Sequence, residues 1–274
     1  MTAGVPPAGA VRVVEWVRHH LYRLHQKLVP APAAMMEMII ATWTSQAITV
    51  AAELGVADAL ADGPLTIDEL AHRVGADADA LRRLLRALIG RGVFRCRPDG
   101  RYEMNSLAHT LCSDAPISMA WAAKFYGSRE QRERWTRLVD AIRTGGSVVP
   151  AMHGKESFDY FAEYPEHAEL FNRTMTSISE LTDASVVAGY DFTAYSKIVD
   201  VGGGHGPLLA NILAATPNSR GVLYDLPTVV SSASELACTT DVADRMYIEA
   251  GSFFDGVPAG GDAYVLKNVL HDWP

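Results

Sequence analysis

The chain has 274 residues, of which 49% are hydrophobic and 20% are charged, and its formal net charge is −8. This length favours two modules, each able to bury a core of its own. The acidic balance gives no electrostatic reason to expect a polyanionic partner, so we expect no nucleic acid. The three cysteines lack the CxxC or Cys/His spacing of a zinc site, which predicts a reduced cytoplasmic protein without a metal: Cys96, Cys112 and Cys238.

The N-terminal segment is predicted to be helical. Residues 1–16 lack a basic region followed by an apolar core, so they do not form a secretory signal. Apolar residues recur at helical spacing over residues 11–28, which predicts one amphipathic helix, and we expect a second helix over residues 35–52.

The most apolar region, residues 33–60, contains Glu37, Gln46 and Glu53. These polar groups lie too close together for a membrane span. The region therefore predicts a buried or dimer-forming pair of helices.

A winged helix-turn-helix is predicted next. Thr66 followed three residues later by Glu69 is a capping box that begins a helix, and Gly75 ends it. Asp77 begins another helix, and residues 93–95 and 102–104 flank the Pro98-Asp99-Gly100 turn as a hairpin.

This pattern leaves two interpretations open. Arg82, Arg83 and Arg86 lie on the helix that would enter a major groove of DNA. The acidic chain and the long domain that follows instead favour a dimerisation module with a solvated basic face.

The rest of the chain changes character after residue 190. Residues 115–187 are predicted to be helical, with breaks at 144–147 and 152–154. Strands and helices then alternate, which is typical of a doubly wound parallel sheet. The predicted strands are 197–201, 221–224, 246–250 and 263–270, and the predicted helices are 207–215 and 229–236.

A glycine-rich turn follows the first of these strands. Gly202, Gly204 and Gly206 lack side chains, so the backbone can approach a ligand closely. The spacing is D-x-G-x-G-x-G, and Pro207 stands where the dinucleotide fingerprint requires its third glycine. The turn therefore disfavours NAD.

Two carboxylates refine the choice of ligand. Asp200, just before the turn, suits a ligand that carries an ammonium group better than it suits a pyrophosphate, and S-adenosylmethionine is such a ligand. Asp225 ends the next strand, where it can accept hydrogen bonds from both ribose hydroxyls. Asp225 alone does not separate NAD from S-adenosylmethionine.

The order of further motifs makes the chain resemble the S-adenosylmethionine-dependent small-molecule O-methyltransferases of the plant caffeate and flavonoid type and their bacterial polyketide-tailoring relatives. The resemblance extends over nearly the whole chain. Besides the winged helix and the glycine turn, it rests on HGKESF at 153–158, FNRTM at 171–175, YDLP at 224–227, GSFF at 251–254 and LKNVLHDW at 266–273.

The resemblance implies a role for each matching residue. Gly202 and Gly204 would contact the cofactor, Asp225 and Leu226 its ribose, Ser252 and Phe253 its adenine, and Lys267 would complete this site. Many relatives have aspartate in place of Ser252. His271 matches the general base, which agrees with an imidazole that titrates near neutral pH and a methyl transfer that needs no metal. Asn172, Met175 and Trp273 would line the acceptor pocket.

The resemblance also predicts an unusual end to the sheet. The family continues beyond the position of Pro274, and its strand order, 3-2-1-4-5-7-6, makes the 263–270 strand internal. In this sequence that strand would be an edge. We therefore expect a fragment, a truncated product, or a chain that needs another chain to complete its sheet.

The sequence thus predicts a winged-helix dimerisation domain over residues 1–115, a helical connector over 116–190 and a Rossmann-like methyltransferase domain over 191–274. The predicted function is methylation of a hydroxyl on an aromatic or polyketide-like small molecule by a cytoplasmic homodimer. The alternatives are a non-catalytic S-adenosylmethionine-binding or regulatory protein and a nicotinamide-dependent oxidoreductase.

Overall fold

A computed structural model of the chain describes residues 8–231 and 241–273. The chain divides into two compact units, residues 1–127 and 128–274. Of the residues expected to form the helical connector, 116–127 fall in the first unit and 128–190 in the second. No described helix is both long and apolar enough to cross a membrane.

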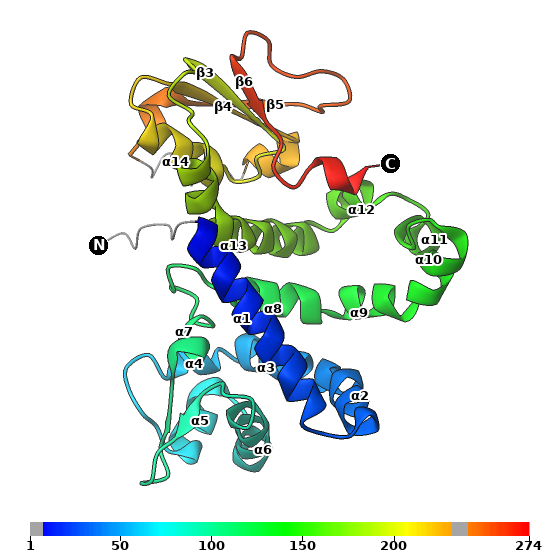
Figure 1. The fold of residues 1–274 in the computed structure, drawn as a ribbon, viewed down its shortest axis with the longest axis vertical. Coiled ribbons are helices and arrows are strands. Elements are labelled where there is room, and N and C mark those ends of the chain that lie inside the picture. Colours follow the sequence, from blue (N-terminus) through cyan, green and yellow to red (C-terminus); the bar gives the residue numbers. More distant parts are fainter. Residues whose placement is uncertain (1–7, 232–240, 274) are drawn as a thin grey trace. The chain divides into compact units, whose positions relative to one another are not determined.

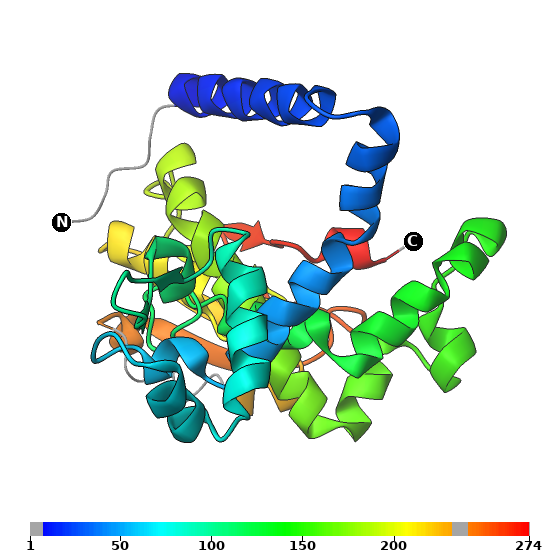
Figure 2. The same ribbon diagram turned by 90° about the horizontal axis from the view of Figure 1, so that it is seen from below.

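The first unit is mainly helical (Figure 1). The predicted helix over 11–28 is confirmed, but the single helix expected over 35–52 is two helices that meet at Ile40. Ile40 has φ −82° and ψ −1°, so the helical backbone bends there (Figure 2). The elements of this unit are α1 Ala8–Lys27, α2 Ala31–Ile39, α3 Ala41–Glu53, α4 Val56–Ala59, α5 Ile67–Val74, α6 Ala78–Ile89, β1 Arg95–Cys96, β2 Tyr102–Glu103, α7 Ser106–His109 and α8 Ala120–Gly127.

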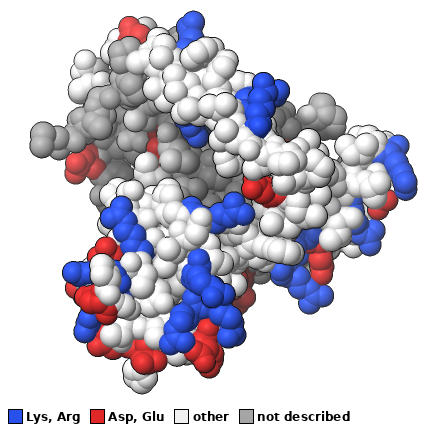
Figure 3. Space-filling view, turned by 60° about the horizontal axis from the view of Figure 1, so that its bottom comes forward, with Lys and Arg blue, Asp and Glu red and all other residues white. Residues whose placement is uncertain are grey.

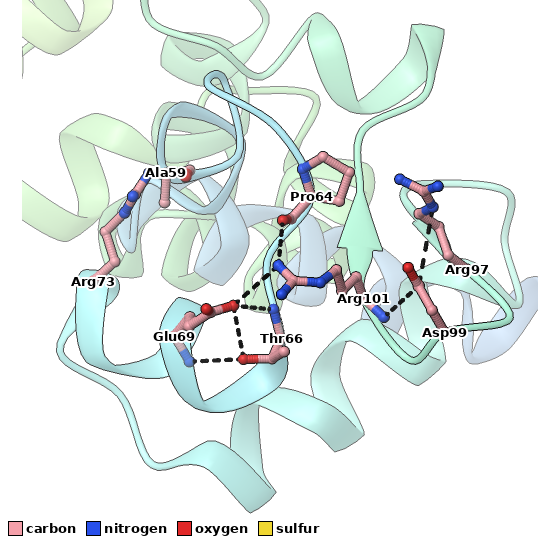
Figure 4. Close-up of polar contacts among 8 residues, drawn as sticks. All are labelled: Ala59, Pro64, Thr66, Glu69, Arg73, Arg97, Asp99 and Arg101. Carbon is pink, nitrogen blue, oxygen red and sulfur yellow. Dashed lines mark hydrogen bonds and ion pairs between the residues drawn. The ribbon is translucent and has the colours of Figure 1, made fainter.

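The winged-helix part forms as its sequence signals predict (Figure 4). The Thr66 hydroxyl accepts a hydrogen bond from the Glu69 amide, and the Glu69 carboxylate accepts one from the Thr66 amide at 2.7 Å, which is a complete capping box. Gly75 ends α5 in the left-handed conformation, and the Asp77 side chain caps α6. The two hairpin strands pair over two residues each, shorter than expected.

Basic and acidic side chains occur near one another in places on the face drawn in Figure 3, separated by uncharged residues. On α6, Arg82 pairs with Asp79, and Arg101 Nη1 lies 3.4 Å from Glu69 Oε2 (Figure 4). Basic side chains of the winged helix are thus partly neutralised by neighbouring carboxylates.

The two described cysteines are free thiols, exposed at Cys96 and buried at Cys112, while Cys238 lies outside the described residues. Asp58, Cys112 and Asp114 bring ligand atoms within 4.8 Å of one another. However, Asp58 Oδ1 already accepts hydrogen bonds from the Ser113 amide and hydroxyl. These hydrogen bonds with Ser113 account for the position of Asp58 beside Cys112 without a metal ion.

The second unit contains a helical segment followed by the sheet. Its elements are α9 Arg129–Thr136, α10 Leu138–Thr144, α11 Val149–His153, α12 Ser157–Glu163, α13 Pro165–Gly189, β3 Lys197–Val201, α14 Pro207–Ala215, β4 Arg220–Asp225, η1 Ala243–Arg245, β5 Met246–Ala250, β6 Ala263–Val265 and η2 Leu270–Asp272. The expected break at 152–154 is wrong in part, because Met152 and His153 are helical and only Gly154, with φ +71°, ends the helix. The predicted helix over 229–236 is described only as far as Ser231.

The sheet is parallel, with strand order β5-β4-β3-β6. Within the described sheet β6 pairs with β3 and forms one edge, as the sequence predicted. The strand expected over 263–270 is shorter, because its partner β3 ends at Val201, where the glycine turn begins. The chain then bends at Asn268, which has φ +56°.

The two faces of the sheet follow from the two-residue period of a strand. Ile198 and Leu223 face α14 and pack with its leucines in one core cluster, whereas Val199, Val201 and Val222 form a second cluster with Tyr224. Figure 1 shows α14 beside the strands. Asp200 shares the face of Ile198, so the sheet places a carboxylate under the start of α14.

Candidate cofactor and acceptor site

The glycine turn between β3 and α14 has the backbone conformation that only glycine adopts readily. Gly202, Gly204 and Gly206 have φ values of +69°, +61° and +84°. The Gly202 amide donates a hydrogen bond to the Tyr224 carbonyl at 2.8 Å, which fixes the turn to the neighbouring strand. Pro207 occupies the first turn of α14.

Asp200 lies beneath this turn rather than on its surface. The residue is 1% exposed, and within the described part of the chain neither carboxylate oxygen has a hydrogen-bond partner. Burial, and then the charges of Asp183 and Asp225, raise the pKa of Asp200 to about 7 against the opposing effect of Lys267. The enclosed carboxylate can attract a cationic ligand through its charge, but a direct contact would require the turn to move.

Asp225 is tied to the turn itself. Its Oδ2 accepts a hydrogen bond from the Gly204 amide at 2.8 Å, and its Oδ1 accepts one from the Leu226 amide at 2.7 Å. Burial raises the pKa of Asp225, although both hydrogen bonds lower it. The parallel register therefore brings the predicted ribose-binding carboxylate and the predicted cofactor turn together.

The predicted adenine-binding residues follow β5. The Gly251 amide donates to the Asp225 carbonyl at 3.0 Å, which joins the end of β5 to the end of β4. The Ser252 hydroxyl accepts a hydrogen bond from the Phe254 amide at 3.3 Å, so it is used locally, and Phe253 packs against the second core cluster.

Lys267 faces α13. Its ammonium donates to the Ser179 carbonyl at 3.1 Å, to the Ser179 hydroxyl at 2.6 Å and to the Asp183 carboxylate. Asp183 is 1% exposed, and its second oxygen, Oδ2, has no hydrogen-bond partner among the residues that the structure describes. Asp183 and Ser179 were not among the predicted site residues, although their four-residue spacing places both on one face of a helix.

His271 lies in η2, beyond the end of β6, and its side chain is 67% exposed. Its Nε2 is 3.3 Å from Oδ1 of Asp272. The imidazole is thus open to a ligand and has a carboxylate beside it.

Trp273 joins the predicted cofactor and acceptor residues. Its ring stacks on Phe158 with centroids 5.6 Å apart and meets the edge of Phe253 at 5.9 Å. Phe158 also contacts Phe171, the neighbour of Asn172, at 6.5 Å. An aromatic cluster therefore connects α12 and α13 to the segments that follow β5 and β6.

Asn172 and Met175 are half-buried on α13. The Asn172 carbonyl accepts a hydrogen bond from the Thr176 hydroxyl at 3.0 Å. Thr176 in turn lies 3.1 Å from Nδ1 of His205, a histidine of the glycine turn that was not among the predicted site residues. These contacts place the predicted acceptor helix beside the predicted cofactor turn.

Comparison with known proteins gives matches along most of the chain. Residues 135–274 match the model of an O-methyltransferase domain, and residues 36–114 match that of an O-methyltransferase dimerisation domain. Among curated proteins, the chain is 38% identical to the phenazine O-methyltransferase PhzM of Lysobacter antibioticus, over 89% of this chain and 72% of the relative. It is also 38% identical to the mitomycin biosynthesis 6-O-methyltransferase of Streptomyces lavendulae, over 89% of this chain and 70% of the relative.

Solved structures give the same result. The O-methyltransferase NcsB1 from neocarzinostatin biosynthesis, solved with S-adenosylmethionine and 2-hydroxy-5-methyl naphthoic acid, superposes with a TM-score of 0.69 at 35% identity. The match extends over 84% of this chain and 71% of that one.

Proposed function

Because the chain belongs to the O-methyltransferase family, we propose that it transfers a methyl group to a hydroxyl of an aromatic or polyketide-like small molecule. The resemblance inferred from the sequence motifs is confirmed, and with it the assignment as an S-adenosylmethionine-dependent O-methyltransferase of the α/β class with a preceding dimerisation domain. Family membership also decides between NAD and S-adenosylmethionine in favour of the latter.

The contact between Asp225 and the glycine turn carries the proposal for the cofactor site. A carboxylate at the end of β4 and a turn without side chains at Gly202 and Gly204 suit a ribose and a ligand that approaches the backbone closely. Gly203 has a different role, because a Cβ there would lie 2.7 Å from the buried Asp200 carboxylate, so its lack of a side chain serves the packing beneath the turn. When bound, S-adenosylmethionine would supply an electrophilic methyl group on a sulfonium.

The other predicted site residues have separate roles in binding the cofactor. Gly202, Gly204, Asp225 and Leu226 would hold the cofactor, with Ser252 and Phe253 beside its adenine. Asp200, beneath the turn, and Lys267, beside it, would influence the bound cofactor through their charges rather than by direct contact. Lys267 is not free for a direct contact, because it already pairs with Asp183.

The acceptor side would use Asn172, Met175 and Trp273 to position a flat substrate. His271 would take the proton of the acceptor hydroxyl on a ring nitrogen, because its imidazole is exposed and a neutral imidazole nitrogen can accept a proton. The aromatic cluster around Trp273 supports a flat, apolar acceptor, since aromatic rings stack favourably. The names of the relatives agree, as they include phenazine and naphthoate methyltransferases.

We also propose a homodimer as the working form. The match of residues 36–114 to a dimerisation domain supports it, and so do the exposed apolar side chains of α1 and α2. A cytoplasmic location remains a prediction.

Titration of S-adenosylhomocysteine into the purified chain by calorimetry, with the molecular mass measured on the same sample, tests this proposal. Binding with one site per subunit in a dimer, lost in Asp225→Ala, is expected. A folded chain that does not bind would contradict the cofactor site. Binding without turnover of any phenolic acceptor would favour the alternative of a non-catalytic cofactor-binding protein.

A further inference from the structure

His205 is a buried histidine inside the glycine turn. It lies between Gly204 and Gly206 and is 7% exposed. Its Nδ1 is 3.1 Å from the hydroxyl oxygen of Thr176, which belongs to α13. This contact joins two segments that are 29 residues apart in the chain.

The direction of this hydrogen bond follows from the hydroxyl of Thr176. A threonine hydroxyl has one proton to donate, and here it is donated to the Asn172 carbonyl at 3.0 Å. With that proton on the Asn172 carbonyl, the hydroxyl oxygen is left to accept from His205, and we therefore assign the imidazole proton to Nδ1.

The surroundings of His205 favour the neutral ring. Burial lowers the pKa of His205, and the nearby Arg173 lowers it further, while Glu169 and Asp225 oppose this shift. A neutral imidazole with the proton on Nδ1 is thus consistent with both its burial and its partner.

Gly204, the residue before His205, is bonded to a different element of the fold. The Gly204 amide donates to Asp225 at the end of β4, whereas the His205 side chain donates to Thr176 on α13. Two consecutive residues of the glycine turn therefore connect the proposed ribose-binding strand with the proposed acceptor helix.

We propose that His205 is a positioning residue, which fixes the glycine turn against α13 so that the cofactor and acceptor sites keep one relative geometry. This inference rests on the proposed function. Glycines give the turn more freedom than other residues, and methyl transfer requires the acceptor oxygen in line with the methyl group. A side-chain hydrogen bond from within the turn restricts that freedom.

Calorimetric titration of S-adenosylhomocysteine into three variants tests the inference. His205→Leu and Thr176→Val each remove the hydrogen bond and should weaken binding about three- to tenfold. In His205→Asn the side-chain amide N–H lies near the position of the imidazole Nδ1, so affinity should recover to within about twofold of wild type. The matched control is Thr182→Val on the same helix, whose hydroxyl donates to the Ser179 carbonyl, and it should not change affinity.

A double-mutant cycle measures whether His205 and Thr176 act together on cofactor affinity. If His205 and Thr176 act through one hydrogen bond, His205→Leu should lose no further affinity when Thr176→Val is already present. Additive losses, or a His205→Asn variant as weak as His205→Leu, would overturn the inference.

Nitrogen chemical shifts of the imidazole give a readout that is independent of affinity. Labelled histidine in the wild-type chain should show His205 as the neutral tautomer with the proton on Nδ1. The tautomer with the proton on Nε2 would overturn the proposed direction of the bond. A wild-type chain that fails to bind S-adenosylhomocysteine would instead contradict the proposed function, so the two failures are distinguishable.

Discussion

Lys267 and Asp183 form an ion pair in the interior of the second unit, which ties the segment after β6 to α13. The Asp183 side chain is 1% exposed and that of Lys267 is 17% exposed. A buried ion pair of this kind adds little to the stability of the folded state compared with an apolar pair of similar size. Removing one partner is nevertheless costly, because the other charge then stays buried without an opposite charge beside it.

Lys267→Met should therefore lower the free energy of unfolding by about 3–5 kcal/mol. Urea unfolding of the purified variant measures this loss. The double variant Lys267→Met with Asp183→Leu should recover most of the stability, because it removes both charges. A single variant as stable as wild type would mean that the pair is not formed.

The buried Asp200 predicts a pH dependence of stability. Its folded-state pKa of about 7 lies above the value in the unfolded chain, near 3.8, so the folded state binds the proton more tightly. Stability from this group is present below about pH 4 and decreases as the pH rises to about 7.

Asp200→Asn should remove that decrease, since the amide does not ionise. The difference in unfolding free energy between variant and wild type should grow in favour of the variant between about pH 4 and pH 7, by a few kcal/mol at most. Asp255→Asn, an exposed carboxylate of the same unit, is the control. A constant difference across this range would contradict a raised pKa at Asp200.

The glycine turn predicts different effects at two neighbouring positions. An added Cβ at Gly203 would lie 2.5 Å from Leu223 Cδ1 and 2.7 Å from the Asp200 carboxylate, whereas at Gly204 it would meet nothing within 4 Å. Gly203→Ala should destabilise the unit by about 1–3 kcal/mol through overpacking. Gly204→Ala should lose about 1 kcal/mol, because its φ of +61° strains any other residue.

Thermal and urea unfolding of both glycine variants measure these changes. Gly189→Ala, at a position where an added Cβ would also meet nothing, serves as control. A Gly203→Ala variant as stable as wild type would contradict the steric limit that Leu223 and Asp200 are expected to set at this position.

His271→Ala should decrease the rate of methyl transfer by about 10²–10⁴-fold while leaving the affinity for S-adenosylhomocysteine nearly unchanged. The side chain is exposed, so its removal should not disturb packing. Single-turnover rates with a phenolic acceptor and calorimetry of the same variant separate the two effects.

Leu270→Ala, at the exposed neighbour of His271, is the matched control for this experiment. Equal losses of rate and cofactor affinity in His271→Ala would mean that His271 has a structural role instead of acting as the base.

The sequence by itself determined the elements whose signals are local. The capping box at Thr66 and Glu69 begins α5, strand β3 runs over Lys197–Val201 as predicted, and α14 has the predicted bounds. Gly202, Gly204 and Gly206 have the positive φ values that their spacing implied. In each case the cause is local: a short-range hydrogen bond, a short and mostly apolar run that ends at a glycine turn, or a steric limit on one residue.

Only the tertiary structure decided the environment of the site residues. The sequence showed Asp200 at the end of a strand, but its burial under α14 depends on which face of the sheet that helix covers. Lys267 was predicted beside the cofactor, yet its partners are Asp183 and Ser179, more than 80 residues earlier. The contact of His205 with Thr176 likewise depends on how α13 packs. Burial and long-range pairing arise from packing between segments that are distant along the chain, so no local pattern could specify them.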